Sequence, residues 1–232
     1  KKFQNTINFI KQKKKIENLY DIGANIGTIC IPAVKRNLIK KAFAVEPEIN
    51  NYKLLKANII LNDLEKEIKT FNFALSDKEN TNCKMEISEE NAGDHRILDK
   101  TKFNFHEEEK REIVDVETKK FDSIFNDLSS GKDLVWIDTQ GHEANILLGA
   151  QNLIKNKIPV VVEFWPYALK RNNSWDKMFK CLEKFDFLVD LSNEDLRLEK
   201  IDNNTLDKLK FGWDDEMKNK HSLFTDLILL KE

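Results

Sequence analysis

Short apolar runs alternate along this chain with longer segments in which apolar residues recur at helical spacing. Two of the runs, KAFAVE at 41–46 and IPVVVEF at 158–164, have the length of a buried strand. Such alternation is typical of a mostly parallel sheet whose strands are joined by crossover helices. It predicts an α/β fold in which helices cover both faces of one sheet, giving a three-layer sandwich.

Seven of the apolar runs are expected to form the sheet, at 16–22, 41–46, 68–75, 133–138, 158–164, 186–191 and 223–231. The last run follows a long polar connection, so it is the strand that we expect to run antiparallel. Apolar residues share one helical face in the segments between the strands. Helices are therefore expected at 26–38, 48–61, 121–128, 142–154 and 174–185.

A polar and charged segment from Ser76 to Glu112 interrupts this pattern. A chain of 232 residues is long enough to bury one large core, whereas a second full domain would be cramped. We therefore expect a single domain at 1–232, with a hairpin and a lid loop inserted at 76–112 after the third strand.

Composition limits the partners and the cellular compartment that we expect for this chain. The net charge of -2 comes from 38 basic and 40 acidic residues spread along the chain, which does not favour a nucleic-acid partner. The basic run at 11–15 is expected to be a solvated helix end, with binding to an anionic surface as the alternative. Three cysteines without a CxxC pair fit a reducing cytoplasm. No apolar run approaches the roughly 20 residues that span a bilayer, so we expect no membrane span.

The segment DIGANIG at 21–27 joins the first expected strand to the next helix. Gly23 permits a tight turn and a close approach of a ligand to the backbone, and Gly27 lets helix and strand touch. Asn25 tolerates the left-handed conformation that a third glycine would otherwise supply. By itself the turn fits either a ligand-binding loop or a simple helix start.

Glu46 ends the second expected strand, 19 residues after Gly27. A carboxylate at this strand tip can accept hydrogen bonds from the two vicinal hydroxyls of a ribose. Beside Pro47 it could instead cap the next helix. The glycine turn, the spacing and the strand-end acid together favour a nucleoside cofactor.

Asp21 indicates which nucleoside cofactor fits. A dinucleotide site favours three glycines and places a pyrophosphate against the helix. The acid at Asp21 would repel a pyrophosphate, but it would attract the ammonium group of S-adenosylmethionine and help to offset the sulfonium. The turn therefore favours S-adenosylmethionine over NAD.

Five segments between Tyr20 and Pro166 resemble the FkbM-type S-adenosylmethionine-dependent methyltransferases: DIGANIG, VEPE, ALSD, WIDTQGHEANILLGA and VVVEFWP. The family usually has Ile-Asp-x-Glu-Gly-x-Glu at the fourth strand, and this chain has Gln140 in place of the first glutamate. The resemblance implies a Rossmann-like class I methyltransferase fold with a mostly parallel seven-stranded sheet and an antiparallel last strand.

The resemblance also implies which residues bind the cofactor. Asp21, Gly23, Asn25 and Gly27 would hold the methionine end, Glu46 the ribose, and Asn72, Ala74 and Ser76 the adenine. Asp138, at the tip of the fourth strand, would orient either the methionine group or an acceptor hydroxyl.

The acceptor side is inferred mainly from chemistry. A sugar hydroxyl is barely acidic, so a base that takes its proton accelerates methyl transfer. We expect His95 or His142 in this role, although each could instead be a polar residue in solvent, and Asp138 is the third catalytic candidate. The expected acceptor-binding residues are Asp94 and Arg96, which could also form a surface salt bridge, and Glu163 and Trp165. Asp138 and Glu163 alone supply too few ligands to predict a metal.

Together these features predict an S-adenosylmethionine-dependent O-methyltransferase that acts on a hydroxyl of a sugar or glycoconjugate. A small-molecule or glycan acceptor is the expected partner. The alternatives are an NAD-dependent oxidoreductase and a non-catalytic S-adenosylmethionine-binding module.

Overall fold

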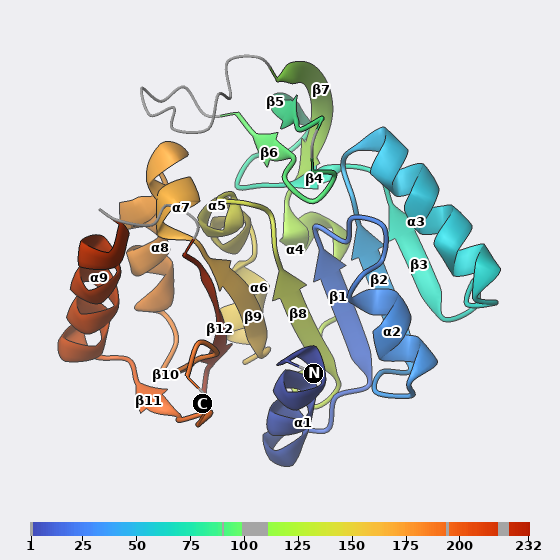
Figure 1. Ribbon diagram of the computed structural model, residues 1–232. Helices are drawn as coiled ribbons and strands as arrows, with labels where there is room; N and C mark the ends of the chain where they lie inside the picture. The colour runs from blue at the N-terminus through green and yellow to red at the C-terminus, as the bar shows by residue number, and fades with distance from the viewer. Residues whose placement is uncertain (1, 90, 99–110, 194, 218–222) are drawn as a thin grey trace.

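A large eight-stranded sheet forms the centre of the molecule (Figure 1). The computed structural model describes residues 2–89, 91–98, 111–193, 195–217 and 223–232. The strand order across the sheet is β11-β10-β12-β9-β8-β1-β2-β3. In chain order the strands are β1 Asn18–Ile22, β2 Lys41–Val45, β3 Ile68–Phe71, β8 Asp133–Ile137, β9 Val160–Phe164, β10 Phe187–Asp190, β11 Glu199–Lys200 and β12 Thr225–Leu230.

Strand directions confirm the predicted α/β class. β3, β2, β1, β8 and β9 run parallel to one another, whereas β12 runs antiparallel to both β9 and β10. The expected strand count of seven needs a correction. The two-residue strand β11 pairs with β10 and makes an eighth strand at the edge of the sheet. A strand this short has no periodicity of its own, so only its tertiary pairing reveals it.

The core lies on both faces of the sheet because side chains alternate along each strand. On β8, Val135 and Ile137 pack into one cluster with side chains of α5, α6 and α8. Leu134 and Trp136 point to the opposite face and pack with α1, α2 and α3. β8 and β9 are buried along their whole length, which explains their continuous apolar sequence.

Helices cover both faces and complete the expected three layers (Figure 1). They are α1 Lys2–Lys13, α2 Cys30–Lys35, α3 Ile49–Leu61, α4 Phe121–Ile124, α5 Glu143–Leu148, α6 Gln151–Lys155, α7 Pro166–Arg171, α8 Trp175–Leu182 and α9 Asn203–Met217. The basic run at 11–15 lies at the end of α1, and most of its side chains are exposed. Among the described residues, no helix combines the length and the apolar character needed to cross a membrane.

A second, four-stranded sheet stands above the carboxyl ends of β1, β2 and β8 (Figure 1). It consists of β4 Ala74–Leu75, β5 Thr81–Ile87, β6 Arg96–Ile97 and β7 Glu112–Lys119. β5 pairs with both β6 and β7 in antiparallel fashion. Part of the segment at 76–112 therefore joins this sheet. Residues 99–110 of the expected lid loop lie outside the described residues, and the single-domain division stays a prediction.

Two expected elements are divided in the structure. The strand expected at 68–75 splits because β3 pairs with β2 in the large sheet, whereas β4 pairs with β7 in the small sheet. Between them, the Asn72 side chain bonds the carbonyl oxygens of Glu46 and Pro47 beyond the end of β2. The helix expected at 142–154 splits into α5 and α6 around Gly149. A Cβ atom on Gly149 would lie 2.1 Å from the carbonyl oxygen of Ser76, so the two segments cross here in close contact.

Candidate functional site

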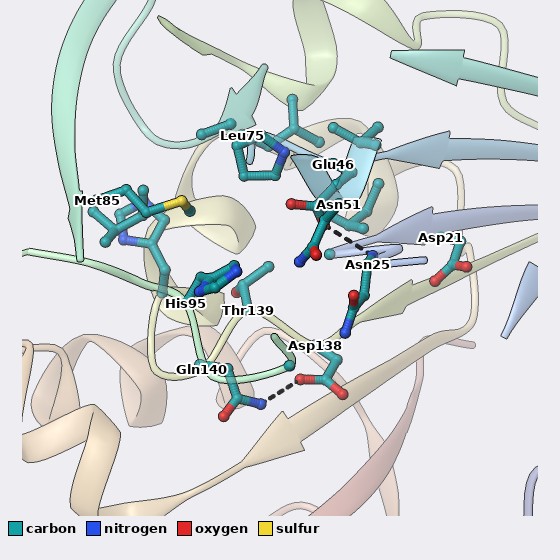
Figure 2. A pocket seen from close by; sticks show the side chains of 18 of the residues that line it. Asp21, Asn25, Glu46, Asn51, Leu75, Met85, His95, Asp138, Thr139 and Gln140 are labelled. Carbon is teal, nitrogen blue, oxygen red and sulfur yellow. Dashed lines mark hydrogen bonds between the residues drawn. The ribbon is translucent and has the colours of Figure 1, made fainter. Parts of the chain in front are cut away.

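A pocket opens where β1, β2 and β8 end, beneath the small sheet (Figure 2). Parallel strands bring their carboxyl ends to one edge of a sheet, and ligands of such sheets bind at this edge. Of the predicted cofactor residues, Asp21, Gly23, Asn25, Glu46, Ala74 and Asp138 line the pocket. In Figure 2 Asp21 lies on one side of the pocket and Met85 on the other.

The glycine turn has the left-handed backbone at Asn25 that its sequence predicts. Asn25 has φ 50°, Gly23 has φ 83° and Gly27 has φ 95°, so all three lie in the left-handed region. A Cβ atom on Gly23 would lie 1.8 Å from the carbonyl oxygen of Asp138. The turn after β1 is therefore packed directly against the end of β8, which leaves no room for a side chain at this position.

Asp21 is almost completely buried beside the pocket, with 1% of its surface exposed. Its Oδ2 accepts a hydrogen bond of 3.0 Å from the backbone N–H of Cys30 at the start of α2. Burial raises the pKa of Asp21 to about 7, and the bond from Cys30 opposes this shift. A cation bound in the pocket would favour the ionised carboxylate.

Asn25 carries an acceptor that has no protein partner. Its Oδ1 atom is buried and makes no hydrogen bond to the part of the chain that the structure describes. Its backbone N–H donates to Oε2 of Glu46 at 2.8 Å (Figure 2). A buried acceptor without a partner costs free energy unless a ligand satisfies it, so this atom points to a donor group in the pocket.

Glu46 lies at the tip of β2 with both carboxylate oxygens held by backbone donors. Oε2 accepts from Asn25, and Oε1 accepts from the N–H of Glu48 at 2.8 Å. Each oxygen keeps a further lone pair, so the carboxylate can accept two hydroxyl groups as well. Burial raises the pKa of Glu46 to about 7.

The three residues predicted beside the adenine have different positions. Ala74 lines the pocket. Asn72 is exposed and bonds backbone carbonyls after β2, so it positions the Glu46 strand tip rather than lining the pocket. Ser76 is buried, and its hydroxyl contacts Nε2 of His142 at 3.0 Å.

The His142 ring is buried, and hydrogen bonds within the protein occupy both of its nitrogens. Lys177 donates to the side-chain oxygen of Asn145, which leaves the Asn145 amide to donate to Nδ1 of His142 at 3.1 Å. The hydrogen is then on Nε2 and is donated to Ser76. This bonding does not favour the expected role of His142 as a base.

His95 lies over the pocket on the segment between β5 and β6 (Figure 2). The backbone N–H of Ser88 donates to its Nδ1 at 3.0 Å. Burial lowers the pKa of His95, so the neutral ring is favoured with its hydrogen on Nε2. In this state the ring offers a hydrogen-bond donor to the pocket, whereas the expected general base needs a free lone pair.

Apolar side chains that the sequence did not single out form the wall near Leu75 and Met85 in Figure 2. They are Phe73, Leu75, Met85, Ile97 and Ile146. Phe73 and Leu75 belong to an expected strand, and the apolar character of that strand is a signal of their burial. Met85 and Ile97 come from the polar and charged segment at 76–112, and only the folding of the small sheet brings them to the pocket.

A second hollow adjoins the pocket and is more polar. It brings together Asp94, Arg96, Glu163 and Trp165, which are the four predicted acceptor-binding residues. Asp138, Gln140 and Gly93 line both cavities. These shared residues form the boundary where two bound ligands would meet.

Asp94 joins two arginines on one side of the hollow. Its carboxylate accepts from Nε of Arg96 and from Nη2 of Arg111, each at 2.6 Å. The Arg96 guanidinium also lies over the Trp165 ring, 4.7 Å from its centroid. One face of Trp165 is therefore covered by a cation, which limits the expected stacking of a sugar on this ring.

Gln140 joins two carboxyl groups on the other side of the hollow. Its Nε2 donates to Oδ1 of Asp138 at 2.8 Å and lies 3.2 and 3.1 Å from the two oxygens of Glu163. The left-handed backbone of Gln140, with φ 55°, turns its side chain back toward these acids. Burial raises the pKa of both carboxyl groups, and Asp138 raises that of Glu163 further.

Glu143 holds the turn between β8 and α5. Its Oε1 accepts from the backbone N–H and the hydroxyl of Thr139 and from the N–H of Gly141, at 2.9 to 3.1 Å. These donors belong to the turn before the helix, so Glu143 fixes the turn against the start of α5 rather than capping the helix. Across the described ranges, no group of three or more histidine, cysteine or acidic side chains is arranged to hold a metal ion.

Comparison with known proteins identifies related families and folds. A family model for the methyltransferase FkbM domain matches residues 21–189. No curated protein has significant sequence similarity to the chain.

Among solved structures, a methyltransferase FkbM from Methylobacillus flagellatus KT is similar, with a TM-score of 0.54 and 12% identity. That match covers 93% of this chain and 44% of the other protein, so the chain spans less than half of that protein's length. The B. subtilis tRNA methyltransferase TrmK gives a TM-score of 0.48 at 11% identity, covering 100% of this chain and 66% of TrmK. At 12% identity the similarity to the FkbM structure concerns the fold alone.

Proposed function

Because the chain belongs to the FkbM methyltransferase family, we propose that it transfers a methyl group from S-adenosylmethionine to a hydroxyl group of a sugar or glycoconjugate. The observation that carries this proposal is the meeting of two cavities at Asp138 and Gln140. One cavity has the features of a nucleoside site, and the other is a polar hollow in which an acceptor hydroxyl can reach the same boundary.

The residues of the first pocket fit this cofactor. The unpartnered Oδ1 of Asn25 and the buried carboxyl group of Asp21 suit the ammonium group of the methionine end. Glu46 suits the two ribose hydroxyls, because each of its oxygens keeps a lone pair. The Nε2–H of His95 supplies one more donor to the ligand.

The apolar wall suits the adenine ring. Phe73, Leu75 and Met85 are buried side chains that line the pocket, and Leu75 and Met85 lie away from Asp21 in Figure 2. A flat heteroaromatic ring gains free energy from contact with such surfaces. Ser76 and His142, which are hydrogen-bonded to each other beside this wall, support its shape. When bound, S-adenosylmethionine supplies a methyl group on a positively charged sulfur, and the carbon–sulfur electron pair stays on sulfur as the new carbon–oxygen bond forms.

The second hollow suits an uncharged acceptor that carries hydroxyl groups. Both of its arginines already pair with Asp94, so they are poorly placed to hold the many phosphates of a nucleic acid. Carboxyl and amide groups of Asp138, Gln140 and Glu163 can instead exchange hydrogen bonds with hydroxyls. This chemistry supports a sugar or glycoconjugate acceptor.

Cofactor binding is the first test. Equilibrium dialysis with labelled S-adenosylmethionine should detect binding to the wild-type chain and a loss of at least about tenfold in affinity for Glu46→Ala, which removes a charged acceptor. Glu65→Ala, at an exposed acid outside the pocket, should bind as the wild type does. Wild-type protein without measurable affinity, or protein that binds NAD instead, would refute the proposal.

The acceptor is tested separately. Purified protein is incubated with S-adenosylmethionine and with panels of nucleotide sugars, glycans, lipids and small acids, and release of S-adenosylhomocysteine is measured. We expect release with hydroxyl-rich sugar acceptors. Release only with acids or lipids would overturn the acceptor class, and cofactor binding without release in any panel would indicate a binding module.

A further inference from the structure

We propose that Asp138 and Glu163 act as one carboxyl pair that shares a single proton, and that the ionised member, Asp138, takes the proton of the acceptor hydroxyl. This inference rests on the proposed methyl transfer. It makes Asp138, at the end of β8, the general base and Glu163, in β9, its partner. Neither histidine then acts as the base.

Gln140 is the structural basis of the pair. One side-chain nitrogen lies within hydrogen-bonding distance of Asp138 and of both oxygens of Glu163. An amide group of this kind can donate two hydrogens, so it can hold both carboxyl groups at once. The arrangement is possible because β8 and β9 are neighbours and end at the same edge of the sheet.

The pair lies where the two ligands would meet. Asp138 lines both the cofactor pocket and the second hollow, whereas Glu163 lines only the hollow. An acceptor hydroxyl placed in the hollow against Asp138 would also face the methionine end of the pocket. A base must be within hydrogen-bonding reach of the proton that it takes, and this position meets that condition.

Surrounding charges keep the pair from losing both protons. Asp226 lies opposite Glu163 in the ladder between β9 and β12, Glu143 is the first residue of α5, and Asp21 is in the neighbouring strand β1. On the far side of the hollow, Arg96 and Arg111 are paired with Asp94. Two adjacent carboxylates among these acids repel each other, so the pair retains one proton.

The environment of each carboxyl group decides which of the two holds the proton. Burial and the negative charges of Asp138, Glu143 and Asp226 raise the pKa of Glu163 well above its usual range. The pKa of Asp138 rises less, to about 6, because Gln140 and Glu163 both donate hydrogen bonds to it. Glu163 is therefore the member that holds the proton more firmly, and Asp138 is the member that ionises first.

The transfer is balanced in charge and protons. The acceptor hydroxyl gives its proton to Asp138, and the electron pair of that O–H bond forms the bond to the methyl carbon. The positive charge of the sulfonium and the negative charge of Asp138 disappear together. Asp138 then returns the proton to solvent before the next turnover.

Gln140 is a positioning residue in this scheme. The family's usual glutamate would place a third carboxyl group beside Asp138 and Glu163, and an ionised glutamate cannot donate a hydrogen bond. The amide in this chain donates to both acids and adds no charge. It therefore stabilises the arrangement with one shared proton.

The shared proton can be tested without cofactor or acceptor. Carboxyl-carbon NMR of the full chain with labelled Asp and Glu should show Glu163, identified by its loss in Glu163→Gln, as protonated at about pH 7. Asp138→Asn should lower the pKa of Glu163, because it removes the adjacent negative charge, whereas Glu65→Gln should not. Titration of Glu163 near its ordinary pKa, or no response to Asp138→Asn, would overturn the proposal.

The catalytic role needs an acceptor from the screen. Asp138→Asn should lower turnover by about 10²–10⁴-fold, the usual contribution of a general base, and this loss should exceed any loss of cofactor affinity. Glu163→Gln should lower turnover far less than Asp138→Asn does, and it should move the acidic limb of the pH–rate profile upward, because an amide is a weaker donor to Asp138.

The two proposals fail in different ways. Near-normal turnover of Asp138→Asn would remove the base assignment while leaving the methyltransferase function intact. Absence of cofactor binding by the wild-type chain would refute the proposed function and, with it, the catalytic role of the pair. The NMR titration would still decide whether the proton is shared.

Discussion

Glu46 is expected to make the folded protein less stable as the pH rises. Burial raises its pKa from 4.5 to about 7. Between these values the folded state keeps a proton that the unfolded state has lost, so the free energy of unfolding falls as the pH increases through this window. One pKa unit corresponds to about 1.4 kcal/mol, and Glu46 alone should therefore cost roughly 2–3 kcal/mol between about pH 5 and about pH 8.

The variant Glu46→Gln isolates this effect, because glutamine has the same shape and does not titrate. It also loses one acceptor for the N–H groups of Asn25 and Glu48, at a cost that is similar at every pH. The absolute stability of the variant is therefore less informative than its pH dependence. The difference in unfolding free energy should move by roughly 2–3 kcal/mol in favour of the variant from about pH 5 to about pH 8.

Urea unfolding, followed by circular dichroism at several pH values without cofactor, measures this difference. Glu65→Gln serves as the control, because Glu65 is exposed and should show no comparable pH dependence. The difference in unfolding free energy between Glu46→Gln and wild type could instead stay constant to about 0.5 kcal/mol from about pH 5 to about pH 8. That result would show that the pKa of Glu46 is not raised in the folded protein.

Three further predictions concern the same strand tips. Affinity for S-adenosylmethionine should increase as the pH rises through about 7, since the ionised Glu46 accepts ribose hydroxyls better; isothermal titration should show this dependence in the wild type and a smaller one in Glu46→Gln, in which Asp21 still titrates. Gly23→Ala should destabilise the protein by more than about 2 kcal/mol and abolish cofactor binding, because its Cβ would meet the Asp138 carbonyl oxygen. Gly131→Ala, where a Cβ would meet no atom within 4 Å, is the control, and equal melting temperatures of the two variants would contradict the packing argument. Gln140→Glu adds a third acid beside Asp138 and Glu163, so it should lower the melting temperature more at about pH 8 than at about pH 5. An equal decrease of the melting temperature at both pH values would contradict the carboxyl pair.

The motifs at the strand ends can be recognised from the order of residues alone. Asn25 has the left-handed backbone that its place between two glycines predicts, and Glu46 lies in the same pocket as the turn. These features are local: a turn needs particular residues at fixed spacing, and the parallel arrangement of strands brings their tips to one edge of the sheet. The family resemblance depends on the same short segments.

The histidines show where sequence reasoning ends. His142 is bonded to Ser76, 66 residues earlier in the chain, and His95 is bonded to the backbone of Ser88. The state of an imidazole ring depends on the partner of each nitrogen. Sequence spacing does not specify these partners, so it does not decide which of the two rings could act as the base.

The sequence by itself determined the fold class, the antiparallel last strand and the acids at the strand tips, because side-chain periodicity and turn chemistry act over a few residues. Only the tertiary structure decided that β4 leaves the large sheet, that Met85 reaches the pocket, and that Gln140 joins Asp138 to Glu163. These contacts form between segments that are distant in sequence, and they depend on which strands become neighbours when the whole core packs.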